Sequence, residues 1–419
     1  MTTASSEFRS GWTTILASAL GACAGLTGLA FYTFGLFVKP LNAAFGWTRG
    51  EITLGMSFIT LGTVVCAPLV GWMIDRWGVR RVAGPSLIGA ALAFVLMSRV
   101  GPDVWTFYAG CLGVAVLGCA TAPVSWTRAV SQRFVKARGL ALGLTLLGSA
   151  TAGVVGVPAV QWLITHRGWS AGYLGIAGFS ALVVFPAVIL LLGRAPKHGG
   201  EGPKLALSGL TLAEALRTGA FWTLAIGVLL LITAQSGTII HLVPMLTDRG
   251  LAPAQAAGIA GTMGLAVFVS RIVVGALLDR FPPALVAGLT LIAPVAAAVI
   301  LATCGADRAA LTVAVLLLGL AAGAEIDFLS YFAARHFGLR AYGQIYGCLF
   351  AMFSLGNGLG APIMGAIYDR TGAYQPALWG GAVLFAGGAA LFASLAWRPV
   401  WPATPSIPGS LASSSAVEA

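Results

Sequence analysis

The chain alternates between long apolar runs and short polar segments. Twelve runs of about 20 residues or more lie at 13–38, 51–74, 82–100, 104–130, 138–164, 171–192, 221–246, 256–278, 284–304, 309–334, 341–368 and 375–396. An α-helix needs about 20 apolar residues to cross ~30 Å of hydrocarbon, whereas the strands of a membrane barrel would alternate in polarity over about 10 residues. The pattern predicts an all-α membrane protein with twelve transmembrane helices.

The composition excludes a soluble protein. Only 9% of the 419 residues are charged and 58% are hydrophobic, with a mean hydropathy of +0.91. A soluble domain carries about 25% charged residues because its surface faces water, and a disordered chain is poor in apolar residues. A lipid bilayer must therefore cover most of this surface.

No sequence signal points to catalysis or to a cofactor. The six cysteines all fall inside the apolar runs without a CxxC pair, so neither a disulfide framework nor a zinc site is expected. The chain has no GxxxxGK[ST] or HExxH motif. The first run is too long for the core of a signal peptide and is interpreted as a retained helix. We expect neither an enzyme nor a bound metal.

The basic residues predict the orientation. The net charge is +11, and if both termini are cytoplasmic, sixteen of the 24 basic residues fall on that side and seven on the other. This is the bias that cytoplasmic loops of membrane proteins show. It explains the net charge without a nucleic-acid partner. We expect a multi-pass protein of a bacterial inner membrane, with both termini cytoplasmic, that functions as a monomer.

The chain matches itself at an offset of 204 residues. The recurring residues comprise an Asp-Arg pair, prolines and glycines: Asp75-Arg76 with Asp279-Arg280, Pro40 with Pro244, Pro158 with Pro362, and Gly71, Gly139 and Gly143 with Gly275, Gly343 and Gly347. The match predicts two parallel six-helix bundles at 1–192 and 221–396, a cytoplasmic linker at 193–220 and a tail at 397–419. Parallel repeats around a midplane site are an architecture of secondary transporters.

The segment from Gly71 to Arg81, with sequence GWMIDRWGVRR, resembles the loop 2–3 signature of the major facilitator superfamily, and Gly275 to Arg280 resembles its second copy. The resemblance implies the major facilitator fold and transport by alternating access. It also implies ion pairs that change with the conformation, and it assigns conformational gating to Asp75, Arg76, Arg80, Asp279 and Arg280.

A narrower resemblance lies at the start of the fifth run. The segment from Phe134 to Gly143, with sequence FVKARGLALG, is similar to a signature of monocarboxylate transporters that oxalate:formate antiporters share, and Ser10-Gly11-Trp12 matches part of a second signature. The resemblance implies proton-coupled symport of a small organic anion.

Three charges within the apolar runs break the duplication. Arg271 stands where the first copy has Ala67, and Glu325 and Asp327 replace uncharged residues. Arg271 lies eight residues before Asp279, about 12 Å into the membrane, and the two acids lie at about 12–15 Å on the tenth helix. A charge at bilayer depth costs about 2.5–3.5 kcal/mol on insertion scales, so these groups should face a cavity or a partner.

Arg271 is the predicted substrate anchor, because a guanidinium binds a carboxylate through two parallel hydrogen bonds. The alternative is a structural ion pair with an acid of helix 10, and the two arrangements can alternate. Glu325 and Asp327 are about 200° apart around the helix. Asp327 shares its face with Tyr331, which favours a substrate contact, and Glu325 faces packed helices. We expect one of these acids to carry a proton; the alternative is helix-to-helix hydrogen bonding.

Two departures from the resembling families narrow the predicted proton site and the predicted substrate. Animal monocarboxylate transporters have an aspartate four residues before the helix 8 arginine, where this chain has Val267, so proton uptake is relocated to helix 10. Oxalate:formate antiporters have a helix 11 lysine where this chain has Leu349. With one deep cation rather than two, a single carboxylate is favoured over a dianion.

Several other polar residues are candidates. Lys39 matches a lysine that monocarboxylate transporters use in proton-coupled entry, or it snorkels to the interface. His241 can titrate near neutral pH or serve as a hydrogen-bonding group. Arg128 is interpreted as a topology-determining arginine, with a place at the inner mouth of the cavity as the alternative. Further substrate contacts are predicted for Tyr32, Gln235 and Asn357.

The favoured function is proton-coupled symport of a small monocarboxylate. One alternative is efflux of larger or cationic compounds, which predicts a buried acid without a buried arginine. Another is uptake of a larger anionic nutrient, such as a vitamin or an aromatic acid. A transporter-shaped sensor would need a larger cytoplasmic domain. The sequence does not decide the identity of the anion or the direction of transport.

Overall fold

The computed structural model describes residues 4–192, 208–398 and 400, which form helices of two bundles. Twelve helices within these residues are long and apolar enough to cross a membrane, as the sequence predicts. Most spans begin and end within a few residues of the apolar runs, but the seventh ends earlier, at Ile240. The first is longer than its run: it extends from Ser5 to Phe45 and ends at Gly46, whose φ of 73° favours glycine. Residues 193–207 of the predicted linker and most of the predicted tail lie outside the described residues.

The first bundle contains six spans, and η marks short 3-10 or π-helical segments within them. Its elements are α1 (Ala4–Ala24), η1 (Leu26–Ala30), α2 (Phe31–Thr33), η2 (Phe34–Phe37), α3 (Val38–Phe45), α4 (Arg49–Trp77), α5 (Val79–Met97), α6 (Val104–Gly118), η3 (Cys119–Thr121), α7 (Pro123–Ser131), α8 (Arg138–Thr151), η4 (Ala152–Gly156), α9 (Val157–Arg167), α10 (Trp169–Gly178), η5 (Phe179–Val184) and α11 (Phe185–Leu191).

The second bundle follows a short helix and also contains six spans. Its elements are α12 (Leu212–Leu216), α13 (Gly219–Ile240), α14 (Leu242–Asp248), α15 (Pro253–Arg280), α16 (Pro283–Leu291), α17 (Ala293–Thr303), α18 (Arg308–Phe337), α19 (Tyr342–Thr371), α20 (Gln375–Ser394) and η6 (Leu395–Trp397).

The first and fourth spans are broken at mid-depth. Helix α1 stops before Gly25 and the span resumes at η1, where the backbone N–H of Leu26 donates to Thr121 Oγ1 at 3.2 Å. The fourth span breaks at Thr121 and restarts at Pro123, whose ring suits the first position of a helix. The two breaks therefore lie side by side, and the fourth span supplies the acceptor for a backbone N–H of the first. Their counterparts α13 and α18 are continuous.

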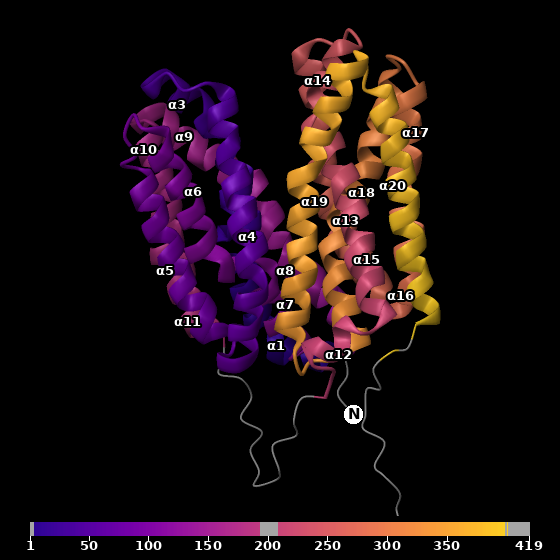
Figure 1. Ribbon diagram of the computed structural model, residues 1–419. Coiled ribbons are helices and arrows are strands. Elements are labelled where there is room, and N and C mark those ends of the chain that lie inside the picture. Colours follow the sequence, from indigo (N-terminus) through magenta and orange to yellow (C-terminus); the bar gives the residue numbers. More distant parts are fainter. Residues whose placement is uncertain (1–3, 193–207, 399, 401–419) are drawn as a thin grey trace, which may run out of the picture.

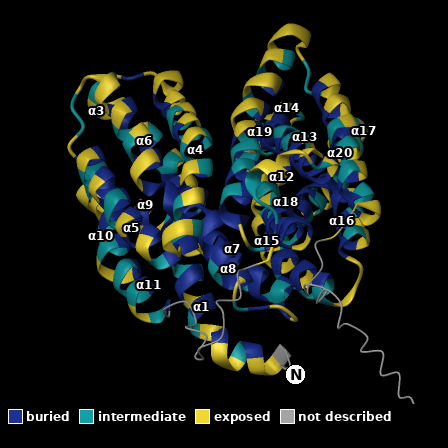
Figure 2. Ribbon diagram, turned by 60° about the horizontal axis from the view of Figure 1, so that its bottom comes forward, coloured by how far each residue is buried: buried dark blue, intermediate teal, exposed yellow. Residues whose placement is uncertain are grey.

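The bundles converge on one side of the membrane and diverge on the other (Figure 1). The converging side carries the beginning of α1, the end of α11 and the beginning of α12, and we call it the linker side. Helices α7 and α8 are largely buried where the bundles meet, whereas outward-facing turns of many helices are exposed (Figure 2).

Candidate functional site

The two bundles touch through glycines on the linker side. A side chain at Gly71 of α4 would collide with the backbone of Gly343 of α19, and a Cβ at Gly275 of α15 would lie 2.8 Å from the carbonyl oxygen of Gly139 of α8. These are the glycines that recur at the offset of 204 residues. The duplication therefore produces two related contacts, α4 with α19 and α15 with α8, in which helix backbones meet directly.

An aspartate caps the partner helix at each contact. Asp75 accepts from the backbone N–H groups of Gly343 and Gln344 at 2.9 Å each. Asp279 accepts from Gly139 at 2.7 Å and from its neighbour on α8 at 2.9 Å. A carboxylate is favourable at a helix N-terminus because the first N–H groups lack partners and the helix dipole is positive there. The two aspartates thus join one bundle to the other.

Arg128 of α7 reinforces one of these contacts. It is 2% exposed, its Nη2 lies 3.2 Å from Asp75 Oδ1, and its Nη1 donates to the carbonyl of Leu339 in the second bundle. Its guanidinium also lies over the ring of Tyr342, 5.7 Å from the centroid. The sequence favoured a topological role for Arg128. The structure places Arg128 at the linker-side contact between the bundles.

The other basic residues of the loop signature stay at the surface in this conformation. Arg76 lies over the ring of Trp72 at 5.5 Å, and Arg280 is exposed. Arg80 is half-buried. Among the described residues, the ion pairs are Arg128 with Asp75 and one at mid-depth, described below.

Glu7 holds the loop before α8 and was not singled out in the sequence. Its carboxylate accepts from the backbone N–H groups of Val135, Lys136 and Ala137 at 3.2–3.3 Å. The residue is 8% exposed. Its nearness to the Gly-Trp pair at Gly11 was the available signal, but the sequence does not show which loop an acid of α1 reaches.

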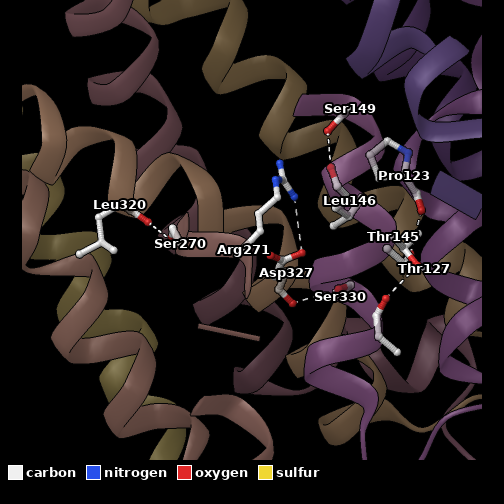
Figure 3. A network of polar contacts seen from close by, with 11 residues as sticks. Pro123, Thr127, Thr145, Leu146, Ser149, Ser270, Arg271, Leu320, Asp327 and Ser330 are labelled. Carbon is white, nitrogen blue, oxygen red and sulfur yellow. Dashed lines mark hydrogen bonds and ion pairs between the residues drawn. The ribbon is translucent and has the colours of Figure 1, made fainter. Parts of the chain in front are cut away.

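The three deep charges gather where α15 meets α18. Arg271 Nη1 lies 3.6 Å from Asp327 Oδ1, and Figure 3 shows the two side chains pointing toward each other. Gly323 packs against Ser270, so the face of α18 that carries Asp327 is turned toward α15. Glu325 is also buried, and it lies close enough to Arg271 for an electrostatic attraction between the two side chains.

Several atoms of this cluster have no hydrogen-bond partner. They are Nε and Nη1 of Arg271, both carboxylate oxygens of Asp327 and Oε1 of Glu325. Asp327 is 0% exposed, Arg271 4% and Glu325 5%. Buried polar groups are usually satisfied, and unsatisfied ones call for an explanation. A polar ligand that accepts from the guanidinium would supply partners for the nitrogens of Arg271, whereas the oxygens of Asp327 and Glu325 would need donors.

The charge cluster lies directly beside a contact between the bundles. The carbonyl of Arg271 packs against Gly143 of α8, four residues from the glycine of α8 that meets Gly275. In the other contact the corresponding pair is Ala67 with Gly347, without a charge. A change at Arg271 is therefore well placed to affect how the bundles close.

The remaining predicted substrate residues occupy varied surroundings. The Tyr331 hydroxyl donates to the carbonyl of Leu278 at 3.2 Å. Gln235 is buried, and neither its amide oxygen nor its amide nitrogen has a partner. The backbone carbonyl of Asn357 accepts from a serine of α13 at 2.8 Å. Tyr32 is 39% exposed in the first bundle.

Two predicted proton-coupling residues lie toward the side opposite the linker. Lys39 of α3 is exposed. His241, between α13 and α14, places Nδ1 3.3 Å from the Tyr374 hydroxyl and Nε2 3.1 Å from the carbonyl of Ala361. Neither residue belongs to the cluster around Arg271.

Two parallel six-helix bundles that span the membrane and close on one side define a transporter for small molecules. The sequence comparisons identify the family: the chain belongs to the Major Facilitator Superfamily, whose model matches residues 20–347.

The similar proteins agree with this class. The chain is 28% identical to human monocarboxylate transporter 11 over 90% of its length and 82% of the relative's. It is 27% identical to bovine monocarboxylate transporter 13 over 91% and 88%. A solved structure of the E. coli fucose:proton symporter FucP superposes with a TM-score of 0.69 at 16% identity, covering 91% of this chain and 97% of that one. This last likeness concerns the fold alone.

Proposed function

We propose that the protein carries a small monocarboxylate together with a proton, and that Arg271 binds the carboxylate. The observation that carries the proposal is the buried guanidinium with unpartnered nitrogens beside two buried acids. The similarity to monocarboxylate transporters 11 and 13 supports the same substrate class. One deep cation suits one carboxylate, because a second buried anion would lack a counter-charge.

The orientation is part of the proposal. With the linker side cytoplasmic, as the basic residues indicate, the conformation is closed toward the cytoplasm and the bundles diverge toward the outside. The linker-side contacts of Asp75, Asp279 and Arg128 then form an inner gate. Closing the outer side would require these caps to release, since the bundles rock as units around the central site.

The coupling mechanism starts from competition for Arg271. In the empty site Asp327 neutralises the guanidinium. An incoming carboxylate takes the place of Asp327, which then lacks a counter-charge and favours a proton, because burial disfavours the charged form of a carboxyl group. The site thus gains an anion and a proton together, so loading does not change its net charge. Glu325 is the second acid able to take this proton.

Uptake by purified protein in liposomes tests the proposal. A panel of radiolabelled acids, comprising lactate, pyruvate, oxalate and a larger aromatic acid, is supplied with and without a pH gradient that is acidic outside. We expect accumulation of lactate or pyruvate that the gradient stimulates. Uptake that does not depend on the gradient would contradict proton coupling. A preference for oxalate would contradict the single-carboxylate site, and a preference for the aromatic acid would favour a larger anionic nutrient as the substrate.

A further inference from the structure

Residues 208–210 of the linker contact the gate region through their backbone. Residues 208–210 run antiparallel to residues 337–339, the loop between α18 and α19, and two backbone hydrogen bonds of 2.8 and 3.0 Å join them. The pairing is centred on Gly209 and Gly338. We call residues 208–210 the bridge segment.

The bridge segment is anchored to the second bundle. Helix α12 follows it directly and starts with a capping box, in which Thr211 and Glu214 satisfy each other's backbone N–H groups. Ala215 of this helix is fully buried, and Leu212 packs against the core of the second bundle. The segment is therefore held in a fixed place.

The loop that the bridge segment holds binds the first bundle. The N–H of Leu339 donates to the bridge segment, and its carbonyl accepts from Arg128, which pairs with Asp75 on its other side. Leu339 thus bonds to the linker through its N–H and to the opposite bundle through its carbonyl. Displacing the loop away from the first bundle would weaken the hydrogen bond to Arg128.

The first copy of the fold restrains the corresponding loop by other means. The counterpart of Leu339 at the offset of 204 is Val135, and its N–H donates to Glu7 of α1. Both loops that precede a capped helix, α8 and α19, are therefore restrained from outside the loop. One restraint is a side-chain carboxylate and the other is the linker backbone, which indicates that each half of the gate requires its loop to be fixed.

We propose that the bridge segment is a positioning element of the inner gate: it holds the Leu339 carbonyl where Arg128 reaches it, and so stabilises the conformation closed on the linker side. The linker is then a structural part of the gate as well as the connection between bundles. The proposal concerns the conformational equilibrium and does not depend on the cargo.

Gly209→Val tests the proposal. The φ of Gly209 is 152°, and a Cβ there would lie 2.6 Å from the Phe337 carbonyl oxygen and 2.9 Å from the Arg340 nitrogen, so the pairing must open. The measurement is the distance between spin labels at Arg81 and Phe281, which are exposed at the linker-side ends of the two bundles. The full chain is used, after replacement of its six cysteines. We expect the population with the longer, linker-side-open distance to rise about tenfold, the equivalent of one or two hydrogen bonds.

Two controls separate positioning from general damage. Asp307→Ala weakens the cap of α18 at the end of that helix far from the bridge, and it should leave the distances unchanged. Arg128→Ala should open the linker side by itself, and adding Gly209→Val to it should produce little further opening, since both act through one contact. Unchanged distances in Gly209→Val, an equal shift in Asp307→Ala, or additive effects in the double variant would each overturn the proposal. If Gly209→Val yields too little folded protein, Gly209→Ala gives the same contact in a smaller form.

Discussion

The two bundles use the same position of the duplicated fold for different purposes. Where the fourth span of the first bundle has Thr121 and Pro123, the tenth span of the second has Glu325 and Asp327. The first pair breaks its helix and satisfies the neighbouring break at Leu26. The second pair leaves α18 continuous and brings acids beside the buried arginine. One bundle thus supplies a bend at mid-depth and the other supplies the charge.

The gate shows how far the copies have stayed alike. Asp75 and Asp279 cap the partner helices with the same geometry. Yet only Asp75 is paired with a buried arginine, because the counterpart of Arg128 in the second copy is Phe332. The capping aspartates, which both copies have, join the bundles. Arg128, which only the first copy has, distinguishes one contact from the other. The differences between the halves can therefore be tested one position at a time.

The largest expected effect on stability comes from Asp327→Asn. This change removes the ion-pair partner of the buried Arg271, which costs on the order of 3–5 kcal/mol. Glu325→Gln is the matched control, and because Glu325 is not the ion-pair partner of Arg271, it should cost about 1 kcal/mol or less. Thermal unfolding in detergent measures both. Equal losses in the two variants would show that the second bundle does not depend on this pair.

The next effect concerns transport. Arg271→Lys keeps the charge but loses the planar fork, so an ammonium cannot hold a carboxylate through two parallel bonds. We expect initial uptake of the transported acid to fall by roughly 10- to 100-fold, the equivalent of about 1.5–3 kcal/mol for a hydrogen bond to a charged group, with normal insertion in the membrane. Arg133→Lys, on the linker-side surface of the first bundle, is the control that should retain uptake. Normal uptake by Arg271→Lys would exclude Arg271 as the anchor.

Much of this architecture was predictable because lipid enforces a simple rule. Every span must be apolar and helical, so the twelve helices follow from run length, and the 204-residue repeat indicates two related bundles. The depth of Arg271 and Asp327 follows from counting along helices that do not kink. Their pairing was one of two alternatives, since a helical register gives the depth of a residue and only partly its direction.

The contacts between distant segments were not predictable. Glu7 reaches the loop at Val135, and Arg128 reaches Leu339, across more than 120 and 200 residues. No periodic pattern records such distances, because the partners on one side are backbone groups, which any residue carries. For the same reason the linker bridge at Gly209 has no signature in the sequence beyond the glycine itself.

The two gate aspartates should differ when each is changed to asparagine. Asp279→Asn removes the charge from two helix-capping hydrogen bonds. Asp75→Asn does the same and also leaves Arg128 buried without its ion-pair partner, which adds about 1–3 kcal/mol. In the spin-label experiment the linker side should therefore open more in Asp75→Asn than in Asp279→Asn. Equal opening would mean that Arg128 contributes nothing to the closed conformation and that the halves of the gate are equivalent.

The smallest effect tests the bend of the first bundle. Thr121→Val removes the hydroxyl that accepts from the backbone N–H of Leu26, and leaving this buried donor unsatisfied costs about 1–2 kcal/mol. Thr145→Val is the matched control, because its hydroxyl donates only to the carbonyl of Ala141 in its own helix. The melting temperature of Thr121→Val should be lower than that of Thr145→Val by a small but measurable interval. If they unfold alike, the adjacent breaks do not support each other, and the bend of the first span must arise from its glycines alone.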